Sequence, residues 1–278
     1  MSGEGLLKNG DINNWEFSNA QFYKYIYFKN DLMIKIKNAL QFLFACWFGF
    51  WTFIGFVILY PGFLITLSNP KWYSYAHMLR RFWGRWLFFF GAIRVKQIIE
   101  EPFDHKKPYI IAPNHTSQLD IVSLTVKLRL DFNFMAKMEL AKVPVFGIFF
   151  RTIDIAVDRK NARQAARAYQ KAMDHLDTGK SIVVFPEGTI HRGVPKLMKF
   201  KDGAFKLAID KQMDILPVTI IGNWLVLPDQ GKFQFMPGKV IQYVHKPIST
   251  KGMTVNQIDE LKQKVFGIIE SKLAEYGY

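Results

Sequence analysis

The sequence predicts an α/β protein with a mixed, largely parallel sheet layered with helices, preceded by an N-terminal membrane-embedded helical hairpin. From about residue 95, short apolar runs alternate with helical patterns, which is typical of a sheet covered by helices. Before that point, residues 38–70 contain no charged side chain. Half of the 278 residues are hydrophobic and 26 are Phe, so the chain has enough apolar mass for a full core with some left over.

The uncharged segment predicts attachment to a membrane, because about 20 apolar residues suffice to cross a bilayer. Pro61 and Gly62 predict a break in its helix, since Pro lacks a backbone donor and Gly is flexible. Symmetric basic flanks favour a hairpin that enters one leaflet, at the inner (cytoplasmic) face, and returns; a true span is the alternative. The basic residues are Lys29, Lys35 and Lys37 before the segment, and Lys71, Arg80, Arg81 and Arg85 after it.

The chain is expected to divide into three parts. Residues 1–37 form a polar and aromatic extension, residues 38–94 a membrane-associated helical segment, and residues 95–278 an α/β domain. Within that domain, apolar runs and helix-capping signals predict the positions of the elements. The expected strands are 109–112, 132–136, 153–157, 181–185, 215–221 and 240–244. One helix is expected to begin at about Ser117, and two more to cover 161–176 and 205–211. The last helix is expected to begin with Thr254 and Gln257 in capping-box spacing.

The composition narrows the class of partner. A formal net charge of +14 favours an anionic partner such as an acidic lipid surface or an acidic carrier. The basic residues are scattered and no nucleic-acid-binding signature occurs, so nucleic acid is not expected. The single cysteine, Cys46, excludes an internal disulfide. The six histidines are dispersed, so no metal site is expected.

The first candidate site follows the strand 109–112 and contains His115 and Asp120. Active sites of open α/β sheets gather beyond the carboxyl ends of strands. A carboxylate that binds one ring nitrogen of a histidine leaves the other nitrogen free to accept a proton from an alcohol. The pair alone is a weak signal, because Ser117 and Asp120 also form a plausible capping box.

The second candidate site follows the strand 181–185 and reads Phe-Pro-Glu-Gly-Thr. The N–H group of Gly188 could hold a phosphate or an oxyanion; a plain strand-ending turn is the alternative. Arg159 also follows a strand and could bind a phosphate through two hydrogen bonds, or it could be a surface cation. Lys137, which lies between the two sites in the sequence, is a further candidate substrate-binding residue.

Four blocks together resemble the glycerolipid acyltransferase family that includes 1-acyl-glycerol-3-phosphate acyltransferase. They are NHTSQLD, KMELAKVPVFG with AVDR, FPEGT, and ILPV around Pro217, and they cover about residues 75–225. The resemblance implies that His115 is the general base and Asp120 its partner, and that Arg159 binds the acceptor phosphate. It also implies that Glu187, Gly188 and Thr189 line the acceptor site.

The resemblance implies transfer of a fatty acyl group to the hydroxyl of 1-acyl-glycerol-3-phosphate, which yields phosphatidic acid. The donor would be acyl-ACP or acyl-CoA, a co-substrate rather than a cofactor, and the partners would be a lysophospholipid, this thioester and membrane lipid. The family commonly has Arg after Glu-Gly-Thr, where this chain has Ile190. The phosphate ligand would then be Arg192, Lys199 or Lys201, unless it is missing.

Three alternatives follow from these observations. Ile190 keeps open a different acceptor, such as a lyso-amino-lipid or glycerol 3-phosphate. A non-catalytic membrane-binding protein on the same scaffold is the second alternative. A lipid phosphatase or esterase that uses His115 and water is the third.

Overall fold

The computed structural model describes residues 31–143, 147–158, 160–229 and 234–278. In this part of the chain, seven strands form one sheet in the order β1-β7-β6-β2-β5-β3-β4. The strands are β1 (Ile93–Ile99), β2 (Ile110–Pro113), β3 (Phe132–Lys137), β4 (Ile155–Val157), β5 (Ser181–Val184), β6 (Ile215–Ile221) and β7 (Gly238–Val244). The α-helices are α2 (Asp31–Leu67), α3 (Tyr73–Phe90), α4 (Leu119–Lys127), α5 (Gly147–Phe150), α6 (Ala162–Asp177), α7 (Gly203–Asp210), α8 (Asn223–Val226) and α9 (Ile258–Glu275), and the 3-10 helices are η1 (Pro70–Trp72), η2 (Met138–Lys142) and η3 (Val255–Gln257).

The sheet is mixed and largely parallel, which confirms the predicted class. Neighbouring strands are parallel except β6 and β7, which are antiparallel. Strand β1 was not predicted. It forms the edge beside β7, and its alternating sequence IRVKQII lacks the continuous apolar run that marks the central strands.

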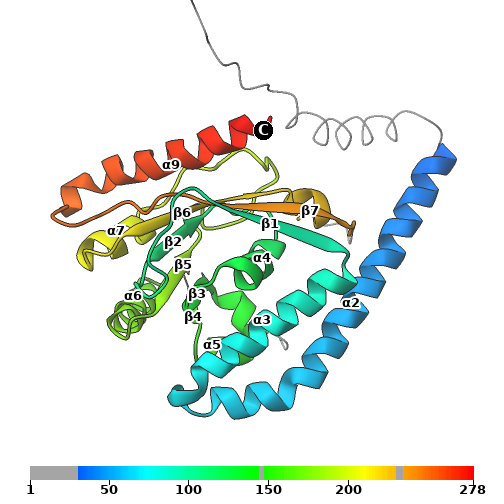
Figure 1. The fold of residues 1–278 in the computed structure, drawn as a ribbon, viewed down its shortest axis with the longest axis horizontal. Coiled ribbons are helices and arrows are strands. Elements are labelled where there is room, and N and C mark those ends of the chain that lie inside the picture. The colour runs from blue at the N-terminus through cyan, green and yellow to red at the C-terminus, as the bar shows by residue number, and fades with distance from the viewer. Residues whose placement is uncertain (1–30, 144–146, 159, 230–233) are drawn as a thin grey trace, which may run out of the picture.

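The sheet separates two apolar layers, because successive side chains of the central strands point to opposite faces. On β2, Ile111 belongs to one buried cluster, whereas Ile110 and Ala112 belong to the other. Residues from α2, α3, α4 and α5 complete the first cluster, and residues from α6, α7 and α9 complete the second. Figure 1 shows α7 and α9 on one side of the sheet and α2 and α3 on the other.

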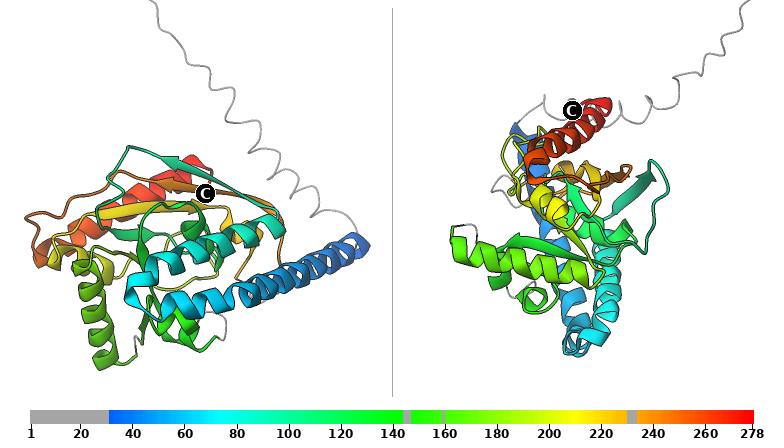
Figure 2. Two further views of the ribbon diagram at one scale, coloured as in Figure 1. Left: turned by 60° about the horizontal axis from the view of Figure 1, so that its bottom comes forward. Right: turned by 90° about the vertical axis from the view of Figure 1, so that its left-hand side faces the viewer.

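The predicted break at Pro61 and Gly62 is wrong, because α2 continues through both residues to Leu67. The helix axis turns near this end (Figure 1), as expected where a proline removes one backbone hydrogen bond. No hairpin forms within residues 38–70. Instead α2 lies antiparallel to α3, as Figures 1 and 2 both show.

Tryptophan side chains hold α2 to α3. The indole N–H of Trp47 donates to the carbonyl of Phe90 at 3.0 Å, and that of Trp86 donates to the carbonyl of Trp51 at 3.0 Å. The rings of Trp51 and Phe90 stack with centroids 3.9 Å apart.

The structure corrects the start of one predicted strand and confirms one predicted capping box. Strand β4 begins at Ile155 rather than at residue 153, because the Asp154 carboxylate accepts the backbone N–H of Phe134 and ends the strand pairing. The capping box of Thr254 and Gln257 is confirmed, and it opens η3 immediately before α9.

Candidate active site

The first site lies where β2 ends, and Asn114 fixes the direction in which the chain leaves the sheet. The Asn114 amide is fully buried. It donates to the carbonyl of Ile220 at 2.9 Å and accepts the N–H of Ile220 at 2.7 Å. This two-way bond ties the end of β2 to the end of β6, so the turn that follows starts from a rigid position.

The turn brings His115 and Asp120 together, as predicted. The His115 Nδ1 atom lies 3.0 Å from the Asp120 Oδ2 atom. With the proton on Nδ1 the imidazole donates to the carboxylate, and Nε2 is then the nitrogen that can accept a proton. The histidine side chain is 13% exposed and the carboxylate 0% exposed, so the pair is reachable only through the imidazole.

The Asp120 carboxylate also holds the turn. Its Oδ2 atom accepts the N–H groups of Thr116 at 2.6 Å and Ser117 at 3.0 Å. Of the capping box expected for Ser117 and Asp120, the bond from the Ser117 N–H to the Asp120 carboxylate is present, whereas the Ser117 hydroxyl donates to the carbonyl of Leu227 instead. The same Asp120 oxygen faces His115. The structural and the catalytic interpretation of this residue do not exclude each other.

Asn223 is a site residue that the sequence analysis missed. Its buried amide donates to Asp120 Oδ1 at 2.7 Å and to Ser123 Oγ at 3.0 Å. Asn223 follows β6 directly after Gly222, whose φ of 93° belongs to the left-handed region. A polar residue just beyond a buried strand at the same sheet edge was the signal that could have identified it.

Glu187 of the second candidate site supports the first. It is 1% exposed, and its Oε1 atom accepts the N–H of His115 at 2.7 Å. Its Oε2 atom accepts the N–H of Met198 at 2.9 Å. Burial raises the pKa of the Glu187 carboxyl, and these two N–H groups oppose the rise.

The imidazole of His115 rests on a fixed apolar platform. Its ring stacks on Phe185, with centroids 3.9 Å apart and planes inclined by 21°. Phe185 follows β5, the parallel neighbour of β2. The two predicted sites therefore meet at one sheet edge.

The other predicted binding residues lie nearer the surface. Lys137 is exposed and pairs with Glu139 at 3.0 Å. Thr189, Arg192 and Lys201 are exposed, and Gly188 has a φ of 77°. Arg159 lies outside the described residues.

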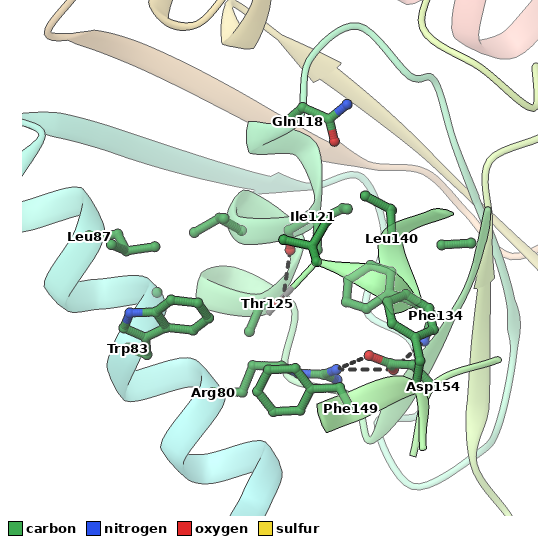
Figure 3. A pocket seen from close by; sticks show the side chains of 15 residues that line it. Arg80, Trp83, Leu87, Gln118, Ile121, Thr125, Phe134, Leu140, Phe149 and Asp154 are labelled. Carbon is green, nitrogen blue, oxygen red and sulfur yellow. Dashed lines mark hydrogen bonds and ion pairs between the residues drawn. The ribbon is translucent and has the colours of Figure 1, made fainter. Parts of the chain in front are cut away.

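Two cavities flank the His115 turn on opposite faces of β3. The first cavity has a volume of about 280 Å³ and extends from Gln118 to the ion pair of Arg80 with Asp154 (Figure 3). Its walls are mostly apolar and come from α3, α4, β3, η2 and α5: Arg80, Trp83, Gly84, Leu87, Gln118, Ile121, Val122, Thr125, Phe134, Ala136, Leu140, Val143, Phe149, Phe150 and Asp154. The second cavity, about 260 Å³, is lined by Met135, Val157, Ala165, Tyr169, Val184, Phe185, Pro186, Gly188, Lys201, Gly203, Ala204 and Leu207.

The floor of the first cavity is a buried polar network. Arg80 binds both oxygens of Asp154 at 3.0 and 3.1 Å and donates to the carbonyl of Phe132. It also donates to Nδ1 of His77 at 3.0 Å. Burial and the neighbouring Arg80 charge hold the pKa of His77 well below its usual value, so His77 is neutral and can accept this bond.

Comparison with known proteins connects this geometry to one family. Residues 94–221 match the family model described as Acyltransferase. A 1-acyl-sn-glycerol-3-phosphate acyltransferase of Chlamydomonas reinhardtii is 26% identical over 249 residues, which are 88% of this chain and 73% of that protein. The 1-acyl-sn-glycerol-3-phosphate acyltransferase of Saccharomyces cerevisiae is 34% identical over 191 residues, 67% of this chain.

The chain spans 62% of the yeast relative's length. The crystal structure of the 1-acyl-sn-glycerophosphate acyltransferase PlsC from Thermotoga maritima matches with a TM-score of 0.72 and 25% identity, over 86% of this chain and 97% of that chain. The shared sequence and fold identify the chain as a member of the acyltransferase family that includes the 1-acyl-sn-glycerol-3-phosphate acyltransferases.

Proposed function

We propose that this protein is a membrane-bound O-acyltransferase that moves a fatty acyl group from acyl-ACP or acyl-CoA to the free hydroxyl of 1-acyl-glycerol-3-phosphate. The product is phosphatidic acid. The observation that carries the proposal is the 3.0 Å bond between His115 and the fully buried Asp120, in a family whose relatives are named for this reaction.

His115 acts as the general base in this proposal. Its Nε2 atom takes the proton of the acceptor hydroxyl while the oxygen forms a bond to the thioester carbonyl carbon. Asp120 stabilises the imidazolium that results. The carbon–sulfur bond then breaks, and the thiolate leaves with the proton returned by the imidazolium. General-base help of this kind contributes on the order of 10²- to 10⁴-fold.

The first cavity is proposed to hold the fatty acyl chain of the donor. Its apolar walls suit a hydrocarbon, and burying each methylene contributes about 0.8 kcal/mol. Gln118, three residues beyond His115, lines one end, and the Arg80–Asp154 pair closes the other. A chain that enters beside His115 therefore points its thioester toward the base, and its length is limited by the charged floor.

The helix pair is proposed to attach the protein to one leaflet. Among the described residues, one helix is long and apolar enough to cross a membrane, over Met33–Leu67. At 1.5 Å per residue it would measure about 52 Å, against about 30 Å of hydrocarbon. Its outward face is apolar, with at least half of each of these side chains exposed: Leu40, Leu43, Phe50, Phe53, Ile58, Leu64 and Ile65.

The opposite face of α2 packs on α3 and the α/β domain, which supports the one-leaflet arrangement. Ala45, Phe56 and Phe63 on this face are buried. Crossing the bilayer would pull α2 away from these contacts and from the tryptophan bonds to α3. The basic residues Arg81 and Arg85 on α3 suit the negatively charged cytoplasmic surface.

The residue that follows Thr189 bears on the identity of the acceptor head group. Ile190 offers no charge beside Thr189, and it is half-buried. A lyso-amino-lipid is therefore tested as an alternative acceptor, because it carries no phosphate that needs a cation at this position. Glycerol 3-phosphate is tested beside it as a phosphate-bearing acceptor that lacks the acyl chain.

The test compares the wild-type protein, purified in detergent, with His115→Ala and with His105→Ala as the matched control. His105 is exposed and precedes β2, whereas His115 follows the other end of this strand. Each protein receives the three acceptors with acyl-ACP or acyl-CoA, and the lipid product is identified by mass spectrometry. We expect phosphatidic acid from the wild type and the control, and at least a 10²-fold loss in His115→Ala.

Two outcomes would overturn the proposal. Release of free fatty acid without any acceptor would identify an esterase. Activity of His115→Ala above a few per cent would remove the histidine from the role of base. Product from another acceptor alone would keep acyl transfer and replace the lysophosphatidic acid.

A further inference from the structure

Asn223 lies outside the part of the chain that the family model matches. That match ends at residue 221, where β6 ends, and Asn223 opens the short helix α8 two residues later. It belongs to none of the four blocks on which the sequence resemblance rests. Its side chain is nevertheless fully buried against the catalytic pair, because it donates to the Asp120 Oδ1 atom at 2.7 Å.

The orientation of the Asn223 amide follows from its partners. Its Nδ2 atom donates to the Asp120 carboxylate and, at 3.0 Å, to the Ser123 hydroxyl, so both of its N–H bonds are used. The reverse orientation would place the amide oxygen against the carboxylate. The Asn223 Oδ1 atom is therefore left buried, without a hydrogen-bond partner among the described residues. Because a buried acceptor without a partner lowers stability, this asparagine is poorly suited to stabilising the fold alone.

The two oxygens of the Asp120 carboxylate have separate partners. Oδ2 accepts the N–H groups of Thr116 and Ser117, and it lies 3.0 Å from His115 Nδ1. Within the described structure, the close donor to Oδ1 is Asn223, since the Thr116 hydroxyl lies 3.5 Å away. A carboxylate held at both oxygens does not rotate, so Oδ2 stays in place for the imidazole.

The backbone on both sides of Asn223 is fixed independently of this bond. Gly222 has a φ of 93°, and a Cβ atom there would meet the Lys239 carbonyl oxygen at 2.7 Å, so the turn after β6 requires glycine. Just beyond α8, the Leu227 carbonyl accepts the Ser117 hydroxyl at 2.7 Å. The segment that carries Asn223 is therefore bound to the catalytic turn at both of its ends.

We propose that Asn223 is a positioning residue for acyl transfer, which holds the Asp120 carboxylate in the orientation that His115 requires. The inference rests on the proposed function. Asn223 acts through Asp120 and touches neither substrate in this assignment. Its loss should therefore lower kcat and leave the KM values of donor and acceptor unchanged.

The first test replaces the amide by an apolar group of the same shape. Asn223→Leu removes the donor without opening a cavity, because the two side chains have the same branching. Asn133→Leu is the matched control: Asn133 is also buried, its Nδ2 atom donates to His175 Nδ1 at 2.9 Å, and its Oδ1 atom has no partner among the described residues. Asn133 lies near the start of β3, whereas the His115 turn follows the end of the parallel strand β2.

Both leucine variants should lose similar stability in thermal denaturation. Only Asn223→Leu should lose kcat, by about ten- to 100-fold, which is the range for a hydrogen bond to a charged group. The KM values for the thioester and for lysophosphatidic acid should stay within about twofold of wild type in both variants. This division between kcat and KM is what a position that only stabilises the fold would not produce.

The second test restores the bond in one protonation state. Two carboxylates at hydrogen-bond distance resist ionising together, so the carboxyl group introduced by Asn223→Asp can keep a proton and donate it to Asp120. Loss of that proton at higher pH leaves two negative charges facing each other. We expect the ratio of variant to wild-type kcat to fall at least about tenfold from about pH 6 to about pH 9, while denaturation shows a folded protein at both values.

A third measurement follows the bond between His115 and Asp120 without substrate. In protein with isotope-labelled histidine, the Nδ1–H proton of His115 is identified by its absence in His115→Ala. A proton bonded to a carboxylate resonates far downfield. This signal should shift or disappear in Asn223→Leu and stay unchanged in Asn133→Leu.

The outcomes separate this inference from the proposed function. A folded Asn223→Leu with a kcat within about threefold of wild type, or an equal loss in Asn133→Leu, would overturn the inference. A raised acceptor KM with unchanged kcat would place Asn223 against the substrate, and a constant kcat ratio for Asn223→Asp would exclude a role for the donor; either would also overturn it. If the wild type transfers no acyl group, the proposed function fails, and an unchanged His115 proton signal in Asn223→Leu would then refute the inference separately.

Discussion

Asp120→Asn tests whether a negative charge beside His115 is needed for catalysis. The substitution keeps the size of the side chain and removes the charge. The Nδ1–Oδ2 distance is 3.0 Å, and the imidazolium charge spreads over the ring. Two unit charges about 4 Å apart at an effective dielectric constant of 20 interact by about 4 kcal/mol. Because 1.36 kcal/mol corresponds to a factor of ten, we expect kcat to fall about 10³-fold.

The same variant should fold. The introduced amide oxygen can still accept the N–H groups of Thr116 and Ser117, and its NH₂ group then faces Asn223. The Asn223 Oδ1 atom is buried and has no hydrogen-bond partner within the described structure. Rotation of the Asn223 amide would let this oxygen accept the new donor. We therefore expect a loss of stability of no more than about 2 kcal/mol, the scale of one altered hydrogen bond.

Two controls separate the charge from the network. Asn223→Ala removes the 2.7 Å bond to Asp120 and leaves the carboxylate in place. Asp174→Asn removes one negative charge from the exposed face of α6. Initial rates are measured with saturating donor and acceptor, and folding is checked by thermal denaturation in detergent. A folded Asp120→Asn within tenfold of wild type, or no less active than Asn223→Ala, would refute the electrostatic role.

Three further predictions follow from other buried groups. Arg80→Met leaves the Asp154 carboxylate without its main partner, so it should lower the free energy of unfolding, measured by denaturant titration, by about 3–5 kcal/mol. The control Arg85→Met, at an exposed position, should leave this free energy unchanged. Glu187→Gln deprives one of two backbone N–H groups of its acceptor, so kcat should fall with the acceptor KM unchanged; a raised acceptor KM would place this side chain against the substrate instead. Burial lowers the pKa of the His245 imidazole to about 4, against 6.5 in the unfolded chain. Below pH 6.5 the unfolded chain takes up this proton more readily than the folded protein, so the free energy of unfolding falls as the pH drops from 6.5 toward 4. His245→Gln should remove on the order of 3 kcal/mol of this dependence.

The sequence predicted the parts of the fold that depend on local patterns. Strands β2, β5 and β6 are buried on both faces, so their sequences are continuous apolar runs. The residues that follow β2 and β5 were expected at one edge because parallel strands end together. The contact of Phe185 with His115 agrees with that expectation.

The features that were missed depend on tertiary contacts. Pro61 does not break α2, because packing of Phe56 and Phe63 on both sides of it holds the helix together. The partner of α2 is the amphipathic α3, which the apolar pattern of residues 38–70 does not reveal. Asn114 and Asn223 act through atoms more than 100 residues away in the chain, and spacing along the sequence carries no sign of such bonds.

The partners of Glu187 change the interpretation of the Phe-Pro-Glu-Gly-Thr block. A carboxylate after a strand suggests a group that faces substrate, and the sequence gives no reason to prefer the backbone. In the structure both oxygens accept backbone N–H groups, one of them from His115. Whether Glu187 also contacts the acceptor stays a prediction, which the KM measurement above tests.

Three side chains hold the His115 turn through bonds to the backbone: Asn114, Asp120 and Glu187. Asn114 ties the end of β2 to β6, Asp120 lies in the first turn of α4, and Glu187 follows β5, so the position of the imidazole is fixed from three directions. A base held in this way loses little freedom when the acceptor and the thioester arrive. Substitutions in this network should therefore lower kcat, whereas those at the first cavity should change the KM or the chain-length preference for the donor. A network variant that changed only the donor KM would contradict this division of roles.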